Sequence, residues 1–382
     1  MADGNSLGRR LRRLRRGVGR DSRVPPPITE DLQGWCAARA DAEHHVLLPG
    51  GPIVRSSRPH TIEPQLDDVF TKYFRTDAPD HVLAGVPRGA IAPEGVVFLP
   101  DGSLVGDSVT HMLEFRGAIL EQTAAYIQPL PARPREVAGS VYSLVIGNAG
   151  NYFHWMQDVM MRLPAAMDVL PPDVRFVVPA PAAPFHAAML DALGFGDVEC
   201  VAMERDEMIV ADRLYFPSPY LKPMLHTAAF MEPFARLCRA HVGVDTGPHD
   251  RRIYITRRRE HHWNVVNEDA VTHLLEARGF ITYDLGELDF ADQIALFSRA
   301  EVVVGTGAGL SNLVFAPAGT KVVQLQDPTY PVGHQFTIAD AMQHEYWYFF
   351  AHAAPSPGSR YGRANLEVPV DRLEECLDAA EV

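Results

Sequence analysis

The second half of the chain alternates short apolar runs with segments of helical length, and this alternation is the strongest constraint on its fold. Strands are predicted at 253–256, 280–283, 301–304 and 321–325, and helices at 267–278 and 290–299. Asn267 and Asp289 can cap the two helix starts, and Gly279 follows the first helix as a stop. Strands that alternate with helices of about ten residues give right-handed crossovers and a parallel sheet. The sequence therefore predicts a Rossmann-like half.

The first half carries weaker signals of the same kind. Apolar runs are predicted to be strands at 141–146, 175–178 and 213–216, with helices after residue 151 and at about 184–193. A hairpin is expected at 96–105, where the turn sequence Pro-Asp-Gly-Ser separates two apolar runs. A turn-rich break at 243–250 marks a domain boundary. We therefore expect a basic leader at 1–27 and two α/β domains, at 28–243 and 250–382.

Charge is divided unevenly along the chain. The formal net charge is −13, but the first 23 residues hold eight Arg and two Asp, so about −19 falls on the rest. An acidic body argues against nucleic acid as a partner, because a phosphate backbone requires a basic surface. For the leader two interpretations stay open: a disordered segment, or a short helix with Leu7, Leu11 and Leu14 that lies on an anionic membrane surface.

The sequence has no apolar run of about 20 residues that would span a bilayer, and its Arg-rich start lacks the apolar core of a secretory signal. We therefore expect a cytoplasmic protein, with contact at the inner membrane face as the alternative that the leader leaves open. The four cysteines, Cys36, Cys200, Cys238 and Cys376, lie far apart without a C-x-x-C spacing. Neither a zinc site nor a disulfide framework is expected.

A glycine-rich turn follows the predicted strand at 301–304. In an open parallel sheet, ligands bind beyond the carboxyl ends of the strands, where loops lead into helix N-termini. The small residues Gly307, Ala308 and Gly309 would let a phosphate group approach the first amides of the next helix. Thr306, Ser311 and Asn312 could add side-chain hydrogen bonds. The alternative is that the glycines only permit a tight turn.

Three arginines, Arg257, Arg258 and Arg259, follow the strand at 253–256 directly. A guanidinium can pair bidentately with a diphosphate and neutralise it as a leaving group. Runs of arginine most often lie on a solvated surface, so we expect one of the three to point inward and choose Arg257.

His154 and Asp158 lie four residues apart at the start of the helix that follows residue 151. A histidine near its ordinary pKa can take a proton from a hydroxyl group. The alternative is a histidine that only packs beside Phe153 and Trp155. The pairs at 44–45 and 261–262 lack a metal-ligand pattern and are interpreted as surface residues.

These segments, in this order, resemble glycosyltransferase family 61, whose bacterial members are often called capsular polysaccharide biosynthesis proteins. The resemblance covers roughly 141–350 and rests on NYFHWMQDVMMRL, RRIYITRR, NEDAV and LDFADQIALFSRAEVVVGTGAGLSNLVFAPAGTKVVQL. It implies a GT-B-like fold with two Rossmann-like domains that face a cleft. It also implies inverting transfer from a nucleotide diphosphate-sugar, commonly a UDP-sugar, without a metal or other cofactor.

The resemblance also assigns residues. Arg257 matches the arginine that ends a strand motif of the family, and Gly307, Ala308, Gly309 and Asn312 match its glycine-loop signature. His154 and Trp155 match the motif of the first domain, and Gln293 matches a glutamine in the helix before the loop. Two positions depart from the family: Trp263-Asn264 stand where many members carry an arginine, and Thr306 stands where many carry a histidine.

We therefore expect an inverting hexosyl- or pentosyltransferase. Its partners would be a nucleotide-sugar donor held by residues 257, 306–309, 311 and 312, and a saccharide acceptor on the side of the 28–243 domain. His154, or else Asp158, would be the catalytic base, in the synthesis of cell-surface polysaccharide. Two alternatives are a non-catalytic nucleotide-sugar-binding protein and a dinucleotide-dependent oxidoreductase. Against the latter, no G-x-G-x-x-G follows an early strand with an acidic residue about 20 positions further on.

Overall fold

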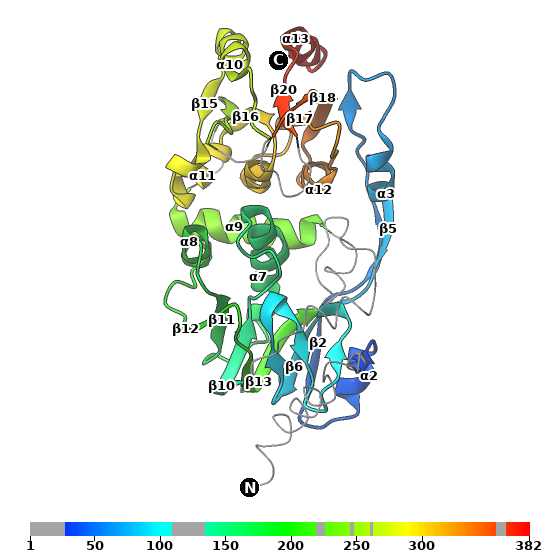
Figure 1. Ribbon diagram of the computed structural model, residues 1–382, viewed down its shortest axis with the longest axis vertical. Helices are drawn as coiled ribbons and strands as arrows, with labels where there is room; N and C mark the ends of the chain where they lie inside the picture. The colour runs from blue at the N-terminus through cyan, green and yellow to red at the C-terminus, as the bar shows by residue number, and fades with distance from the viewer. Residues whose placement is uncertain (1–26, 109–133, 219–225, 245–247, 260–262, 357–363) are drawn as a thin grey trace. The chain divides into compact units, whose positions relative to one another are not determined.

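The computed structural model describes residues 27–108, 134–218, 226–244, 248–259, 263–356 and 364–382 (Figure 1). These residues form two compact units, each built around one main sheet. The first unit takes described residues within 1–51, 79–187 and 197–222, and the second takes those within 52–78, 188–196 and 223–382. The basic leader predicted at 1–27 and the histidines at 261–262 lie outside the described residues, apart from residue 27.

The second unit holds a six-stranded sheet in which every neighbouring pair is parallel. Its order is β15-β14-β16-β17-β18-β4. The strands are β14 (Arg251–Ile255), β15 (Ile281–Tyr283), β16 (Ala300–Gly305), β17 (Lys321–Gln326), β18 (Glu345–Phe350) and β4 (His60–Thr61). The strands predicted at 253–256, 280–283, 301–304 and 321–325 are therefore confirmed to within one or two residues. A mixed α/β fold with parallel sheets is confirmed as well.

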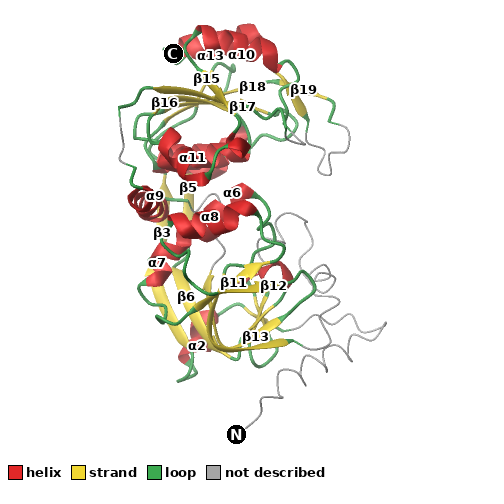
Figure 2. Cartoon of the chain, turned by 90° about the vertical axis from the view of Figure 1, so that its left-hand side faces the viewer, coloured by secondary structure: helices red, strands yellow, loops and turns green. Residues whose placement is uncertain are grey.

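Helices cover both faces of this sheet (Figure 2). On one side lie α10 (Glu268–Ala277) and α13 (Val370–Ala379), which pack against each other. On the other lie α11 (Phe290–Phe297), α12 (His334–Ala341) and the helix η7 (Ala308–Phe315). The helix α9 (Ala228–Val242) packs against η7 and α11. The buried β-branched residues Val302, Val304 and Val323 form part of the core between the sheet and the helices.

The predicted helix boundaries hold for the most part. Asp289 caps α11, because its carboxylate accepts a hydrogen bond from the Asp292 amide at 2.7 Å. Gly279 follows α10 with a φ of +82°, which a residue with a Cβ adopts poorly. Asn267 precedes α10 but does not cap it. Its side chain instead exchanges two hydrogen bonds with the backbone of Val368, so it joins the start of α10 to the start of α13.

Smaller elements complete the second unit. Two two-stranded sheets pair β3 (Gly51–Val54) with β5 (Arg75–Ala78), and β19 (His352–Ala354) with β20 (Asn365–Glu367). Three short helices are η1 (Asp68–Phe70), α3 (Thr71–Phe74) and η6 (Leu285–Glu287). Arg55, which follows β3, is 3% exposed and pairs with Asp340 of α12 at 3.3 Å. This ion pair fixes the early segment 52–78 to a helix nearly 300 residues further along the chain.

The first unit holds a ten-stranded mixed sheet. Four of its strands are parallel and lie in the order β13-β10-β11-β12, with bounds β10 (Arg135–Ser143), β11 (Arg175–Pro179), β12 (Cys200–Met203) and β13 (Ile209–Ser218). The others are β1 (Ile28–Thr29), β2 (Glu43–Leu48), β6 (His81–Pro87), β7 (Ala90–Ile91), β8 (Val97–Phe98) and β9 (Leu104–Val105). The antiparallel pair β8–β9 confirms the predicted hairpin.

The helices of the first unit are mostly short. They are α2 (Leu32–Ala37), η2 (Pro93–Gly95) and α8 (Pro184–Ala192), of which the last runs on into the second unit. A continuous helical segment after β10 consists of α6 (Tyr152–His154), η3 (Trp155–Val159), η4 (Met160–Arg162) and α7 (Leu163–Met167). The η3 part is a π-helix and η4 is a 3₁₀-helix. Across the described part of the chain, every helix is too short or too polar to span a bilayer.

Candidate functional site

The six-stranded sheet has a topological switch point between β14 and β16. From β14 the chain first crosses to β15 on one side, and then returns to place β16 on the other side. In such sheets, ligands bind outside the carboxyl ends of the two strands at which the direction of crossover reverses. Arg257 follows β14 and Thr306 follows β16, so both predicted segments lie at this switch point.

The Arg257 side chain lies directly against Gly307. A Cβ atom built on Gly307 would come within 2.6 Å of an Arg257 terminal guanidinium nitrogen and 2.8 Å of its Cζ. Gly307 also has φ +76° and ψ −157°, a conformation essentially restricted to glycine. The guanidinium Cζ lies 5.9 Å from the centroid of the Trp263 ring. The glycine is therefore needed both for the turn and for the close approach of a cation to its backbone.

The two neighbouring arginines have acidic partners. Arg258 donates to Glu268 at 2.9 Å and to Asp269 at 2.7 Å. Arg259 pairs with Glu287 and, at 3.5 Å, with Asp284. Among the three arginines, Arg257 is the one that lies on the glycine turn.

The glycine turn leads into η7, which is a 3₁₀-helix rather than the α-helix usual at such a turn. Ala308 and Gly309 are half-buried, so the first amides of η7 lie near the surface of this unit. The first N–H groups of a helix have no acceptor within it and carry a partial positive charge. Thr306 is 5% exposed and lies at the end of β16.

Ser311 and Asn312 lie in the interior, with no exposed surface. Asn312 donates to the Gln293 side chain at 2.8 Å, and Gln293 donates to the Leu285 and Leu288 carbonyls at 2.9 and 3.2 Å. Asn312 and Gln293 therefore brace η7 against α11 and the loop before it. Both residues were singled out from the sequence, and the structure brings them together.

A chain of buried polar side chains holds the Gly307 carbonyl. Gln335 donates to this carbonyl at 3.4 Å, and Gln324 donates to Gln335 at 3.3 Å. The Tyr346 hydroxyl donates to Gln324 at 2.6 Å, and burial holds the pKa of Tyr346 far above its ordinary value, so it stays a neutral donor. Sequence reasoning missed these residues. The signal that would have pointed to them is Gln324, a polar residue between the apolar residues Val323 and Leu325 of β17.

In the first unit, His154 and Asp158 form a close pair. His154 Nδ1 lies 2.7 Å from an Asp158 carboxylate oxygen. The Asp158 side chain is 2% exposed, and that of His154 is 16% exposed. Asn151 caps α6, because its side chain accepts hydrogen bonds from the Phe153 and His154 amides. A carboxylate that accepts from Nδ1–H fixes the tautomer in which Nε2 carries the lone pair.

A second histidine holds the loop that leads to this pair. His186 lies 2.7 Å from the Ala149 carbonyl through Nε2, and its Nδ1 accepts from the Ala183 amide at 3.2 Å. Its ring packs on Trp155 with centroids 4.0 Å apart. Burial lowers the pKa of His186, which favours the neutral form that can donate and accept at once. The predicted residue Trp155 is fully buried and has this packing role.

The described residues contain no group of three or more His, Cys, Asp or Glu side chains that could hold a metal ion. Of the early histidine pair, His45 lies 3.3 Å from Glu43 on β2, and both are half-buried. Neither observation indicates a functional site in addition to the switch point and the His154–Asp158 pair.

The fold and these residues define an α/β protein with a candidate ligand site at the switch point of a parallel sheet. Residues 152–323 match the model of the family described as Glycosyltransferase 61. This segment includes His154, Asp158, Arg257 and the glycine turn. Over this segment, which is less than half of the chain, the protein is similar to glycosyltransferase family 61, and this match identifies it as a glycosyltransferase. No curated protein matches the chain.

Proposed function

We propose that the protein is an inverting glycosyltransferase that moves a sugar from a nucleotide diphosphate-sugar, most simply a UDP-sugar, to a saccharide acceptor. The observation that carries this proposal is the contact between Arg257 and Gly307 at the β14/β16 switch point. There a guanidinium and the first amides of η7 present positive charge to the same place. A diphosphate is the group whose shape and charge fit such a place.

In this proposal, Arg257 and the amides of Ala308 and Gly309 bind the donor diphosphate. As the bond between the anomeric carbon and the diphosphate oxygen breaks, its electron pair passes to that oxygen. The guanidinium stabilises the charge that develops there. Fixed cationic and N–H groups thus take the part that a divalent cation plays in other transferases, so we propose a reaction without a metal ion.

His154 is the proposed catalytic base. Its Nε2 takes the proton of the acceptor hydroxyl while the hydroxyl oxygen attacks the anomeric carbon from the side opposite the diphosphate. A single displacement of this kind inverts the configuration of that carbon. The buried Asp158 is a positioning residue, because its carboxylate fixes the tautomer of His154 and stabilises the imidazolium that forms. We therefore choose His154 over Asp158 as the group that meets the acceptor.

The proposal also includes the domain arrangement, the location of the protein and the product that it helps to make. The family resemblance supports a GT-B-like arrangement of the two units and a role in cell-surface polysaccharide synthesis. The location that we propose is the cytoplasm. The Arg-rich leader supports contact with the inner membrane face.

Replacement of arginines at the switch point tests the donor site. We expect UDP, but not NAD, to raise the melting temperature of the protein, and a panel of UDP-sugars to reveal a donor by slow hydrolysis. Arg257→Ala should abolish the rise in melting temperature caused by UDP, and it should lower turnover at least about a hundredfold. Arg259→Ala, whose side chain is 70% exposed, is the matched control and should behave as wild type. Normal turnover of Arg257→Ala, or loss of activity on addition of a chelator, contradicts the proposed mechanism.

A further inference from the structure

Glu268 is the first residue of α10 and lies in the NEDAV segment, to which the proposed function gives no role. Its side chain is only 4% exposed, although it ends in a carboxylate. A buried carboxylate is costly unless hydrogen-bond donors surround it and an opposite charge pairs with it. The groups that donate to Glu268 therefore indicate what this residue does.

Three side chains from one short segment donate to this carboxylate. The Tyr254 hydroxyl donates to Oε1 at 3.0 Å, and the Thr256 hydroxyl donates to the same oxygen at 2.5 Å. Arg258 donates to Oε2 through Nε at 2.9 Å. The carboxylate of Glu268 thus holds alternate residues of the segment in which β14 ends and the chain leaves the sheet.

The middle of this segment is Arg257, the arginine that lies on the glycine turn. The Thr256 hydroxyl also accepts a hydrogen bond from the Arg258 amide at 3.2 Å. Both chain neighbours of Arg257 are therefore joined to each other and to Glu268. The backbone that carries the Arg257 side chain is held on either side, while its guanidinium extends to Gly307.

We propose that Glu268 is a positioning residue, whose carboxylate holds Thr256 and Arg258 so that the guanidinium between them points at the glycine turn. This inference rests on the proposed function for the role of Arg257 in donor binding. Fixing a long arginine side chain costs rotamer entropy, and a backbone that is already held lowers the cost of binding. Glu268 therefore raises the affinity for a diphosphate without contacting it.

The hydroxyl of Thr256 is the contact that tests this role most directly. Arg258 is 60% exposed, so solvent and salt screen its ion pair with Glu268. Tyr254 is fully buried, and burial raises its pKa well above the ordinary value, so it stays a neutral donor within the strand. Thr256 donates to Glu268 and accepts from the Arg258 amide, so its hydroxyl links the carboxylate to the turn.

Two substitutions of similar shape separate positioning from stability. Thr256→Val and Tyr254→Phe each remove one hydroxyl that donates to Glu268 Oε1, so both should lower the melting temperature. Thr256→Val also releases the turn, so we expect it to raise the Kd of UDP about tenfold, as measured by calorimetry. Tyr254→Phe should bind UDP as the wild type does, and Thr256→Ser, which keeps the hydroxyl, should do the same. Wild-type affinity of Thr256→Val, or an equal loss in Tyr254→Phe, overturns the inference.

Glu268→Gln tests the carboxylate itself. Its amide oxygen can accept from the two hydroxyls, but its amide nitrogen then faces the Nε–H of Arg258, and neither group accepts a hydrogen bond. We expect the Kd of UDP to rise about tenfold. Asp269→Asn is the matched control, because Asp269 contacts the same guanidinium with a side chain that is 93% exposed. A Kd that Glu268→Gln leaves unchanged contradicts the proposal.

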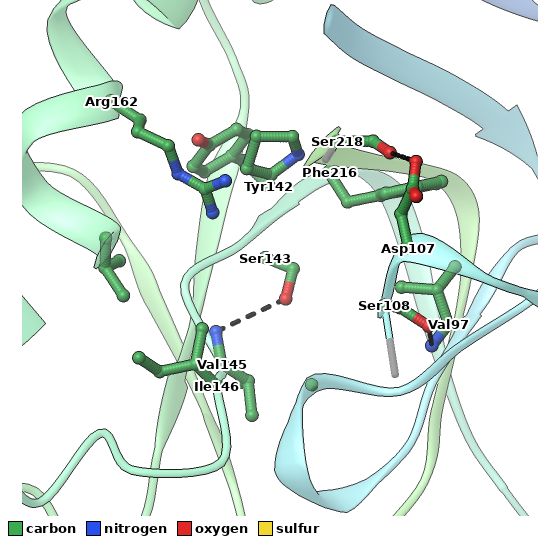
Figure 3. Close-up of a pocket in the computed structure, with 13 residues that line it drawn as sticks. Val97, Asp107, Ser108, Tyr142, Ser143, Val145, Ile146, Arg162, Phe216 and Ser218 are labelled. Atoms are coloured by element: carbon green, nitrogen blue, oxygen red, sulfur yellow. Dashed lines mark hydrogen bonds between the residues drawn. The ribbon is translucent and has the colours of Figure 1, made fainter. Parts of the chain in front are cut away.

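A second control removes the same kind of hydrogen bond from the first unit. There the Ser218 hydroxyl donates to Asp107 at 2.5 Å in the lining of a cavity (Figure 3). Ser218→Ala loses this bond and changes no residue of the second unit. It should lower the melting temperature and leave the Kd of UDP at its wild-type value. A tenfold rise in that Kd would mean that general destabilisation explains the effect of Thr256→Val, and the proposal would fail.

A measurement without UDP separates this inference from the proposed function. The ¹⁵N relaxation of Arg257 Nε in the ligand-free full chain, assigned through its loss in Arg257→Ala, reports how firmly this side chain is held. We expect its order parameter to fall by about a third or more in Thr256→Val and to stay constant in Tyr254→Phe. If it falls as expected but UDP does not bind the wild type, the proposed function fails and the positioning role stands. If UDP binds the wild type but Thr256→Val changes neither the order parameter nor the Kd, the positioning role fails and the donor site stands.

Discussion

The guanidinium of Arg257 occupies the space that a Cβ atom on Gly307 would require, with a terminal nitrogen 2.6 Å from that position. Gly307→Ala therefore forces Arg257 away from the turn and strains a backbone at φ +76°. We expect a loss of about 1–3 kcal/mol in the free energy of unfolding. Turnover should fall about a hundredfold, because a small displacement of a binding group is enough for such a loss.

Gly319→Ala is the matched control for this prediction. Gly319 has φ +84°, and a Cβ built there meets nothing within 4 Å. The control also places a side chain at a positive φ but leaves Arg257 in place, so it should lose stability and keep turnover. Urea unfolding and a transfer assay on both variants measure the two effects. Equal loss of turnover in the two variants would show that the contact with Arg257 has no role.

The pair of His154 and Asp158 predicts that loss of the Asp158 charge lowers kcat without changing KM. Asp158→Asn preserves the shape of the side chain but removes the charge that stabilises a protonated His154. We expect kcat to fall about a hundredfold or more and the KM values of donor and acceptor to stay nearly constant. Asp168→Asn, on the exposed end of the same helical segment, should have no effect. If Asp158→Asn changes KM and leaves kcat intact, the pair does not act in proton transfer.

The parallel sheet of the second unit could be predicted because its strands and helices are signalled locally. Apolar runs of four to six residues, the Asp289 cap and the Gly279 stop are all visible within a few positions of the sequence. Arg257 and Gly307 were found for the same reason, since each follows directly on a strand. Their contact could then be expected from the rule that the carboxyl ends of parallel strands share one edge.

Features that depend on distant parts of the chain could not be predicted. The two-residue strand β4 pairs with β18 through hydrogen bonds between segments almost 290 residues apart, and His60 and Thr61 carry no strand pattern. In the sequence, Gln335 and Tyr346 look like ordinary polar residues. Only the fold places them in one series of hydrogen bonds that ends at the Gly307 carbonyl. The π-helical turn at Trp155–Val159 is hidden too, because one extra residue per turn barely changes a helical pattern.

The buried side chain of Gln335 should tune the affinity for the donor. Gln335→Met has a similar volume but removes the donor to the Gly307 carbonyl, which costs about 1 kcal/mol of net hydrogen bonding. We expect kcat/KM for the donor to fall about fivefold through a higher KM, and protection by UDP to weaken. Gln65→Met, on an exposed loop, is the control. Unchanged donor KM in Gln335→Met would mean that the polar chain does not position the turn.

His344 makes the stability of the second unit depend on pH. It is 5% exposed, and its Nε2 lies 2.9 Å from the carbonyl of Leu313 in η7. Burial lowers the pKa of His344 from 6.5 to about 4. Between these two values the unfolded chain binds a proton that the folded chain does not. The contribution of His344 is therefore fully present above pH 6.5 and is lost as the pH falls toward 4.

His344→Gln isolates this contribution, because its amide still donates to the Leu313 carbonyl and does not titrate. Between pH 7 and pH 5, the wild type should lose about 2 kcal/mol more of its free energy of unfolding than the variant does. His81, whose pKa burial lowers to about 3, adds its own loss to both proteins and cancels in the comparison. Urea unfolding of both proteins at the two pH values measures the difference. Parallel losses would show that His344 titrates normally in the folded chain and that its burial does not govern the acid sensitivity of η7.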